Sequence, residues 1–325
     1  MRDGLDLEAV QAAAARLDGV AYQTPVLESR RLNDIAGVRV LAKAESLQHT
    51  GSFKFRGAFN RLSQIPAEDR QRGVVAWSSG NHAQGIAAAG ALLNIPTTIV
   101  MPEDAPANKT RRTRELGAEI VTYNRTTEAR EPIARALVEE RGAILVPSFD
   151  DWDVMAGQGT AGLELSTWLQ AANIEPDVLA IPCGGGGLTA GVSTVFASTM
   201  PNVKVVTVEP EHHDDYARSL ASGGRERNVD VPDTLCDALM APQPGELTFA
   251  VNQHTVSRGL AVTEEEVLRA MAVAAAELKV VVEPGGVVAL AAVLAGKMTG
   301  DCVALILSGG NVDTDVFQRA LANYA

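Results

Sequence analysis

The chain has 325 residues, 46% of them hydrophobic, and a formal net charge of -12 at pH 7. This acidic balance without a basic stripe speaks against nucleic acid or an anionic membrane as a partner. The length exceeds the ~100 to 200 residues of one typical domain, so two domains are expected. Three scattered cysteines, no signal segment and no run of ~18 apolar residues favour a reducing cytoplasm.

Strand-like and helix-like segments alternate along the chain, a pattern that predicts an α/β fold with mostly parallel sheets flanked by helices. Strands are expected at residues 38–44, 74–77, 97–101, 119–123, 143–146, 178–183, 204–208 and 302–307. Helices are expected at residues 82–93, 127–141 and 188–196.

The first segment that indicates chemistry is centred on Lys54, within Thr-Gly-Ser-Phe-Lys-Phe-Arg-Gly-Ala at residues 50–58. Phe53 and Phe55 are expected to keep its amine dry. An ammonium group in apolar surroundings has a lowered pKa, so it becomes a nucleophile toward carbonyl carbons. The alternative is an ordinary surface lysine on an amphipathic stretch.

A polar loop, Ser78-Ser79-Gly80-Asn81-His82, follows the strand at 74–77 and opens the helix at 82–93. Its hydroxyls, its amide and the unpaired N–H groups of the helix start would converge on one spot. Such a site suits a carboxylate. The alternative is an ordinary N-cap by serine or asparagine.

A run of four glycines, Gly184-Gly185-Gly186-Gly187, separates the strand at 178–183 from the helix at 188–196. Residues without Cβ let successive N–H groups converge on an anion, and the start of the helix favours that anion further. The run therefore predicts a phosphate site. It is not a Walker loop, because no Gly-Lys-Ser or Gly-Lys-Thr follows.

A dinucleotide site is the alternative reading of this region. Gly185, Gly187 and Ala190 fit the Rossmann spacing, and Glu209 lies ~20 residues further on, where a ribose-binding acid is expected. That reading predicts a nicotinamide-dependent oxidoreductase. It leaves the aromatic-flanked lysine and the polar loop without a role.

The last feature is Leu-Ser-Gly-Gly-Asn at residues 307–311, which ends the strand at 302–307. Ser308 would present its hydroxyl at the carboxyl edge of the sheet. Without the other three segments, a plain glycine-rich turn would be the better interpretation.

These four segments, in this order, resemble the second fold type of pyridoxal-phosphate enzymes, which is tryptophan synthase β-like. Within it the chain is similar to the serine/threonine dehydratase and serine racemase family over residues 24–313. The resemblance implies a homodimer with a large pyridoxal 5′-phosphate (PLP) domain at 1–72 and 149–325. A small inserted domain at 73–148 would hold the carboxylate loop.

The resemblance also implies residue roles. Lys54 would bind PLP covalently and act as the catalytic base, with Phe53 beside the pyridine ring. The other PLP contacts would be Asn81 at the 3′-oxygen, Gly184, Gly185, Gly186 and Gly187 at the phosphate, and Ser308 at the ring nitrogen. The substrate carboxylate would be surrounded by Ser78, Ser79, Gly80, Asn81 and His82.

The expected activity is an ammonia-lyase that removes water from a β-hydroxy amino acid of the L-threonine or L-serine type, giving a 2-oxo acid and ammonia. A neutral Ser308 at the ring nitrogen makes the ring a weaker electron sink, which favours early loss of the β-hydroxyl. Ser79 matches racemases, where it exchanges the α-proton from the second face, whereas Ala83 matches dehydratases. Serine racemase is therefore an alternative, and an inactive amino-acid sensor is a third class.

Two further sites follow from the resemblance. Arg130 would pair with a second substrate carboxylate, which would make 3-hydroxyaspartate a substrate. Glu209, Asp215 and the backbone carbonyl of His213 would bind Mg²⁺, Ca²⁺ or Mn²⁺, because hard cations prefer oxygen ligands. The alternatives are a solvated helix residue for Arg130 and a solvated acidic loop for the metal residues.

Overall fold

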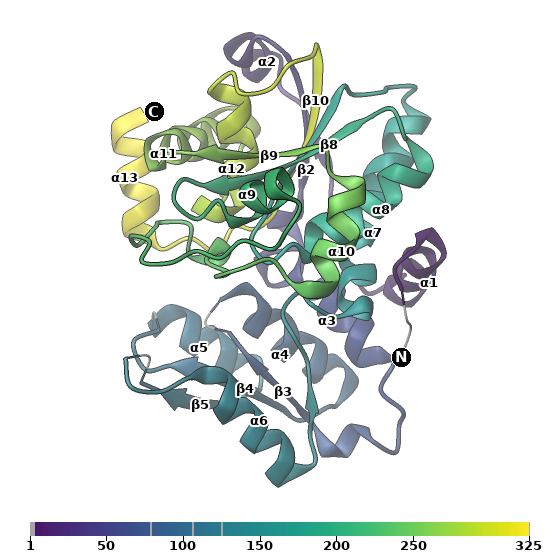
Figure 1. Cartoon of the computed structure of the whole chain (residues 1–325), viewed down its shortest axis with the longest axis vertical. Helices are drawn as coiled ribbons and strands as arrows, with labels where there is room; N and C mark the ends of the chain where they lie inside the picture. The colour runs from purple at the N-terminus through teal and green to yellow at the C-terminus, as the bar shows by residue number, and fades with distance from the viewer. Residues whose placement is uncertain (1–3, 79, 106, 125, 325) are drawn as a thin grey trace.

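The computed structural model describes residues 4–78, 80–105, 107–124 and 126–324, which form two sheets flanked by helices (Figure 1). The strands are β1 Val26–Leu27, β2 Arg39–Ala44, β3 Val74–Trp77, β4 Thr97–Pro102, β5 Glu119–Tyr123, β6 Ile144–Leu145, β7 Val178–Pro182, β8 Lys204–Pro210, β9 Arg258–Val262 and β10 Cys302–Leu307. The α/β fold class predicted from the sequence is confirmed.

The helices connect these strands and cover the sheets. They are α1 Leu7–Leu17, α2 Arg30–Ala36, α3 Lys54–Ser63, α4 Asn81–Leu93, α5 Ala107–Glu115, α6 Arg130–Arg141, α7 Trp152–Ala171, α8 Gly187–Thr199, α9 Asp215–Ser222, α10 Glu246–Thr255, α11 Glu264–Val273, α12 Pro284–Leu294 and α13 Thr314–Tyr324. A π-helical turn, Ala274–Leu278, continues α11.

The larger sheet has six strands in the order β1-β2-β10-β7-β8-β9, and only the β1–β2 pair is antiparallel. Residues of α11 and α12 share a core with one face, and residues of α7 and α8 share a core with the other. A sheet covered on both faces needs continuous apolar strands, which is why β7 and β10 are almost entirely buried hydrophobic runs.

The smaller sheet has four parallel strands in the order β5-β4-β3-β6. Residues of α4 pack on one face and residues of α6 on the other. Three buried side chains of α3, Phe55, Phe59 and Leu62, belong to the same core as α4. The helix that begins at Lys54 is therefore held between the two sheets (Figure 1).

The chain order places three of the predicted segments at carboxyl ends of parallel strands. The four glycines follow β7, Ser308 follows β10, and α4 begins after β3. Because β7 and β10 are hydrogen-bonded neighbours, the glycines and Ser308 leave adjacent strands at the same edge. Ligands of α/β sheets bind at this edge.

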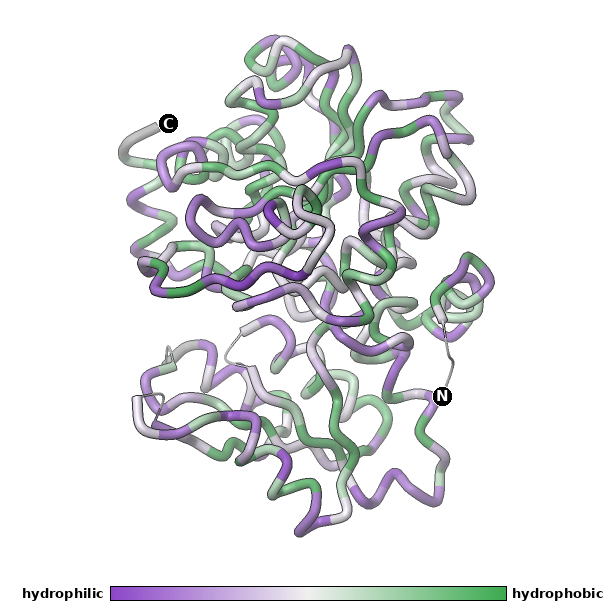
Figure 2. The backbone as a smooth tube through the Cα atoms, viewed as in Figure 1, coloured by the Kyte–Doolittle hydropathy of each residue, from purple (hydrophilic) through white to green (hydrophobic). Residues whose placement is uncertain are grey.

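Hydrophobic residues are concentrated in the central strands, whereas hydrophilic residues are frequent in the outer loops (Figure 2). Among the described residues, no helix is long and apolar enough to cross a membrane.

Candidate active site

Lys54 is the first residue of α3, and its side chain is partly buried. Nζ donates a hydrogen bond to the carbonyl oxygen of Ser148 at 2.7 Å and lies 5.2 Å from the centroid of the Phe53 ring. Burial lowers the pKa of this amine to about 8, although the nearby Glu283 carboxylate acts in the opposite direction. Phe55 instead packs its ring against His49 and Phe59 in the core.

The glycine loop links β7 to α8 and leaves no room for side chains. A Cβ on Gly185 would lie 2.4 Å from the Phe149 ring, and a Cβ on Gly186 would lie 2.3 Å from the Tyr216 hydroxyl. Gly186 also has a φ of 92°, in the left-handed region that glycine tolerates. Glycine is thus required here for packing and for conformation.

The carbonyl groups of the loop are bound by the protein. Thr248 Oγ1 donates to the Gly185 carbonyl at 2.7 Å, and Asn252 Nδ2 donates to the Gly186 carbonyl at 3.2 Å. Within the described chain, the N–H groups of Gly184, Gly185, Gly186 and Gly187 make no hydrogen bond. Unpaired N–H groups at the start of α8 suit a phosphate, so this loop fits the group predicted for it.

The segment after β6 joins the lysine to the glycine loop. Ser148 accepts the hydrogen bond of the Lys54 amine, and the next residue, Phe149, packs on Gly185 and Gly187. Sequence reasoning missed both residues. Ser148 acts through its backbone carbonyl, so no side-chain signal could have identified it.

Ser308 lies directly after β10 and is 5% exposed. Its backbone carbonyl accepts a hydrogen bond from the Phe53 N–H at 3.1 Å, which joins it to the segment that carries Lys54. No hydrogen bond of its hydroxyl to another described residue is found. The hydroxyl is therefore available to a ligand, as its predicted role requires.

The polar loop before α4 is only partly described. Ser78 Oγ accepts a hydrogen bond from the Gly80 N–H at 3.2 Å, so it turns the chain into the helix. Ser79, predicted to be catalytic and to bind substrate, lies outside the described residues. Gly80 precedes α4 and supplies no side-chain cap, which leaves the helix start open to an anion.

His82 is buried in the first turn of α4. Burial, and next the positive charge of Lys54, lower its pKa to about 3, against the effect of the Val146 carbonyl 3.3 Å from its Nε2. The ring is therefore neutral at pH 7. Its other nitrogen, Nδ1, is buried without a partner in the described part of the chain.

Glu283 is a buried carboxylate that sequence reasoning missed. It precedes α12, and its Oε1 accepts a hydrogen bond from Asn81 Nδ2 at 2.5 Å. Burial, and next the charge of Asp237, raise its pKa to about 7, whereas Asn81, Lys109 and Lys54 lower it. The only sequence signal was Glu-Pro at a helix start, which predicts a cap rather than an active-site acid.

Replacement of Glu283 by glutamine should lower the pKa of Lys54 below about 8, because the carboxylate charge that favours the ammonium form is lost. The test is the pH profile of Lys54 modification by an amine-reactive reagent, located by peptide mass spectrometry. Its midpoint should move to lower pH in Glu283→Gln. An unchanged or higher midpoint would show that Glu283 does not act on this amine.

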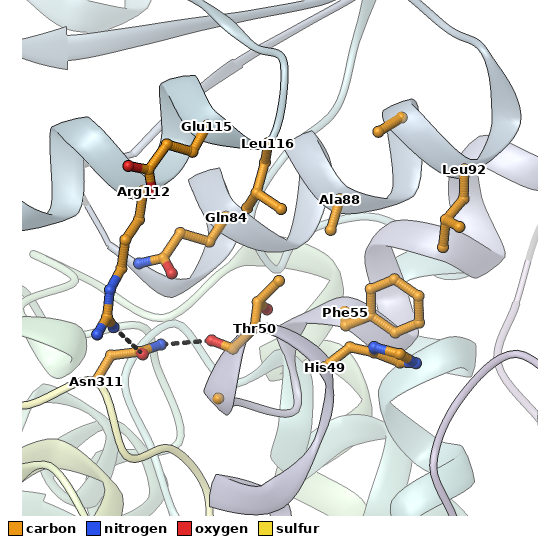
Figure 3. A pocket seen from close by; sticks show the side chains of 12 residues that line it. His49, Thr50, Phe55, Gln84, Ala88, Leu92, Arg112, Glu115, Leu116 and Asn311 are labelled. Atoms are coloured by element: carbon orange, nitrogen blue, oxygen red, sulfur yellow. Dashed lines mark hydrogen bonds between the residues drawn. The ribbon is translucent and has the colours of Figure 1, made fainter.

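A cavity of about 740 Å³ opens beside α4 and α5 and is lined mainly by apolar atoms (Figure 3). At its wall, Asn311 accepts a hydrogen bond from Arg112 at 3.2 Å and donates to the Thr50 carbonyl at 2.7 Å. Asn311 Nδ2 also donates to Asn81 Oδ1 at 2.7 Å. The cavity wall therefore contacts Asn81, although neither Lys54 nor the glycine loop lines the cavity.

Two of the predicted metal residues, Glu209 and Asp215, are buried near each other, whereas the ring of His213, also buried, lies with its Nε2 2.8 Å from the Pro232 carbonyl. Glu209 is fully buried, and its oxygens accept the N–H groups of Tyr216 at 2.9 Å and Ala217 at 2.7 Å. Burial, and next the charge of Asp215, raise the pKa of Glu209 well above its usual range. Glu209 is thus unavailable to a ribose, which removes the support for the dinucleotide alternative.

Asp215 is 1% exposed, and burial raises its pKa to about 7. Its Oδ1 accepts from Asn228 Nδ2 at 2.6 Å, whereas its Oδ2 is buried with no partner in the described region. An orphaned carboxylate oxygen near a second buried acid fits a cation. In the described ranges, no three His, Cys, Asp or Glu side chains form a metal cluster, and the predicted set contains only two such side chains.

Arg130 begins α6 and is exposed. No hydrogen bond or ion pair of its side chain with the rest of the described chain is found. The structure does not bring it together with Lys54 or the polar loop, so its role stays a prediction.

A phosphorylated aldehyde suits this arrangement, because a phosphate matches the unpaired N–H groups of the loop and an aldehyde matches a buried amine with a lowered pKa. Fold and site thus define an enzyme that uses such a coenzyme. The family of pyridoxal-phosphate dependent enzymes matches residues 17–309, and the chain belongs to this family.

Among its relatives is an L-threo-3-hydroxyaspartate ammonia-lyase from a Pseudomonas species, 44% identical over 95% of this chain and 96% of the relative. A serine racemase from Schizosaccharomyces pombe is 37% identical over 96% of each chain. The crystal structure of a threonine deaminase from T.th. superposes with a TM-score of 0.89 at 43% identity, covering 95% of this chain and 99% of that one. The predicted PLP fold type II is therefore confirmed.

Proposed function

We propose that the chain is a PLP-dependent dehydratase that releases ammonia and a 2-oxo acid from a β-hydroxy amino acid. The observation that carries the proposal is the buried Lys54 amine, with its pKa at about 8, held through Ser148 and Phe149 against the glycine loop. The similarity to an ammonia-lyase, which extends over 95% of this chain, supports the proposal.

Each residue has a role set by its surroundings. When bound, PLP withdraws electrons from the substrate α-carbon. The Lys54 amine is partly unprotonated near pH 8, so its Nζ accepts the α-proton as a general base. The N–H groups at the start of α4 hold the substrate carboxylate. Ser308 would present its uncharged hydroxyl to the ring nitrogen of bound PLP, which would favour elimination over transamination.

The experiment that tests this function is a turnover screen. Purified protein with PLP is incubated with L-threonine, L-serine and L-threo-3-hydroxyaspartate, and with their D-isomers, while ammonia and 2-oxo acid are measured. Equal amounts of both products from at least one L-substrate are expected. Binding of these amino acids without product would instead identify an inactive sensor.

We propose Arg130 as the residue that distinguishes 3-hydroxyaspartate from serine. The exposed side chain at the start of α6 must turn inward to reach a second carboxylate. A charged hydrogen bond contributes about 1.5 to 3 kcal/mol. Arg130→Met should therefore lower the ratio of kcat/KM for hydroxyaspartate over L-serine about 10- to 100-fold, and an unchanged ratio would exclude this role.

Racemisation is the second candidate activity, because a serine racemase is among the relatives and because Ser79 stands in the carboxylate loop. Ser79→Ala should suppress exchange of the α-proton from the second face more than elimination from the L-substrate. The measurement is deuterium incorporation into D- and L-serine in heavy water, alongside ammonia release. Equal loss of both activities would assign Ser79 to substrate binding only.

We further propose that Mg²⁺, or Ca²⁺ or Mn²⁺, binds Glu209, Asp215 and the His213 carbonyl. Support comes from the two buried acids and from the Asp215 oxygen that has no partner among the described residues.

The division into domains at 1–72 with 149–325 and at 73–148 is a proposal supported by the two separate sheets. A cytoplasmic homodimer is proposed as well, supported by three free cysteines and by the resemblance.

A further inference from the structure

One buried tyrosine contacts both the proposed cation site and the glycine loop. Tyr216 follows Asp215 in the first turn of α9 and is fully buried. Its N–H donates to Glu209 Oε1 at 2.9 Å, so its backbone is held by a proposed cation ligand. Its side chain extends to the other side, where the hydroxyl lies 2.3 Å from the position of a Cβ on Gly186.

The Tyr216 hydroxyl also reaches the loop through two side chains of α10. Asn252 Nδ2 donates to the hydroxyl at 2.7 Å and to the Gly186 carbonyl at 3.2 Å. The hydroxyl donates to Thr248 Oγ1 at 3.3 Å, and Thr248 in turn donates to the Gly185 carbonyl at 2.7 Å. Asn252 and Thr248 are both fully buried. We call the three residues Tyr216, Asn252 and Thr248 the Tyr216 bridge.

The geometry of the peptide unit explains what the bridge does. A trans peptide is planar, so its C=O and the next N–H point in opposite directions. By holding the carbonyls of Gly185 and Gly186 on the protein side, the bridge turns the N–H groups of Gly186 and Gly187 to the ligand side. The N–H groups of Ala190 and Gly245 bind the same carbonyls, at 2.8 and 3.2 Å, so the Tyr216 hydroxyl acts together with them in setting how well these donors converge on an anion.

The backbone of Tyr216, at the start of α9, is held by Glu209, an acid of the proposed cation site, so its position would respond to a bound cation. Glu209 and Asp215 are buried acids, and Asp215 Oδ2 has no partner among the described residues. A cation bound there would draw the two carboxylates together and hold the start of α9, to which Tyr216 belongs. Because the protein interior is closely packed, such a restraint is transmitted to the neighbouring side chains.

We propose that Tyr216 is a positioning residue that couples cation binding at Glu209 and Asp215 to phosphate binding at the glycine loop. The inference rests on the proposed function. Coupling between sites is reciprocal, so the cation strengthens phosphate binding by the factor with which phosphate strengthens cation binding. Measured couplings are about 5- to 150-fold, and about tenfold is expected here.

The test measures affinity rather than turnover. The full chain, freed of coenzyme, is titrated calorimetrically with pyridoxine 5′-phosphate, which carries the phosphate but no aldehyde for Lys54. Titrations are run with Mg²⁺ and with a chelator, and Mg²⁺ binding is titrated separately. The wild type should bind the probe about tenfold more tightly with Mg²⁺. Pyridoxine, which has no phosphate, should show no such difference.

Tyr216→Phe keeps both carboxylates and the ring but removes the hydroxyl. It should still bind Mg²⁺, while the Mg²⁺ effect on the probe falls to about twofold or less. Thr248→Val, which removes the donor to Gly185, should reduce the effect in the same way and serves if Tyr216→Phe does not fold. Tyr22→Phe removes an exposed tyrosine hydroxyl and should keep the full effect.

The outcomes separate the coupling from the function. A full Mg²⁺ effect in both bridge variants, or no effect in a wild type that binds Mg²⁺ and probe, overturns the coupling and leaves the function intact. A wild type that binds the probe but no Mg²⁺ overturns the coupling together with the cation site. A wild type that binds no probe overturns the proposed function as well.

Discussion

Replacement of Lys54 by alanine is expected to lower turnover of β-hydroxy amino acids by about 10³-fold or more, because the variant would lose both the proposed covalent anchor for PLP and the proposed general base. The glycine loop and Ser308 are unchanged, so PLP should still dock through its phosphate. Ammonia release measures the first effect, and equilibrium dialysis of PLP measures the second.

Lys204→Ala is the matched control, because Lys204 is an exposed lysine in β8 and should be replaceable without loss of turnover. Borohydride treatment of the wild type with PLP should fix the coenzyme to one lysine, which peptide mapping is expected to identify as Lys54. Full turnover in Lys54→Ala, or a label on a different lysine, would contradict the assignment.

Local signals in the sequence were sufficient for much of the fold. The strands β3, β5 and β10 have the bounds that were predicted from the sequence, and β3 directly follows Gly73 and β10 directly follows Asp301. The glycine run indicated its own conformation, because four residues without Cβ after an apolar strand permit few alternatives. The turn and the helix start at Gly187 follow from it.

The elements that sequence reasoning missed depend on contacts that are distant in the chain. β1 has two residues and is a strand only because it pairs with β2. β9 has an intermediate burial pattern without a clear period, so only its pairing with β8 defines it. A local pattern carries no information on such pairs.

The same distinction holds for the site. Lys54, the glycines and Ser308 were predicted because they stand in sequence motifs. Glu283 and the Ser148 carbonyl were not, because they contact or influence Lys54 from positions 229 (283 − 54) and 94 (148 − 54) residues further along the chain. Tyr216 resembles an ordinary apolar helix residue. Its neighbours Asn252 and Thr248 are polar residues on a helix that has no motif.

Arg56 lies two residues after Lys54 and fixes the helix that carries it. Its guanidinium is fully buried and binds Glu45 with both ends, Nε to Oε2 at 2.7 Å and Nη2 to Oε1 at 2.8 Å. It also binds Glu164 on α7 at 2.6 Å. Burial alone would raise the pKa of Glu45, but Arg56 outweighs burial and holds that pKa below its usual range.

Arg56→Met should destabilise the protein by about 3 to 5 kcal/mol, because it leaves the Glu45 carboxylate buried without its cation. The measurement is the free energy of unfolding in urea at pH 7. The double variant Arg56→Met with Glu45→Leu removes both charges and should recover most of the loss. If the double variant is no more stable than the single one, the unpaired charge is not the cause.

The pH dependence supplies an independent check on the same mechanism. In the wild type the pKa of Glu45 is lowered in the folded state, so its contribution is present above the unfolded pKa and is lost as the pH falls through the folded value. In Arg56→Met burial, the largest cause, is opposed only by the Lys43 charge and the Thr24 hydrogen bond and should raise the folded pKa, so the folded state takes up a proton at a higher pH than the unfolded state. The stability gap to wild type should therefore narrow as the pH falls from 7 toward about 4.3, the usual pKa of a glutamate. A gap that stays constant over this range would mean that lost packing, and not the buried carboxylate, destabilises the variant.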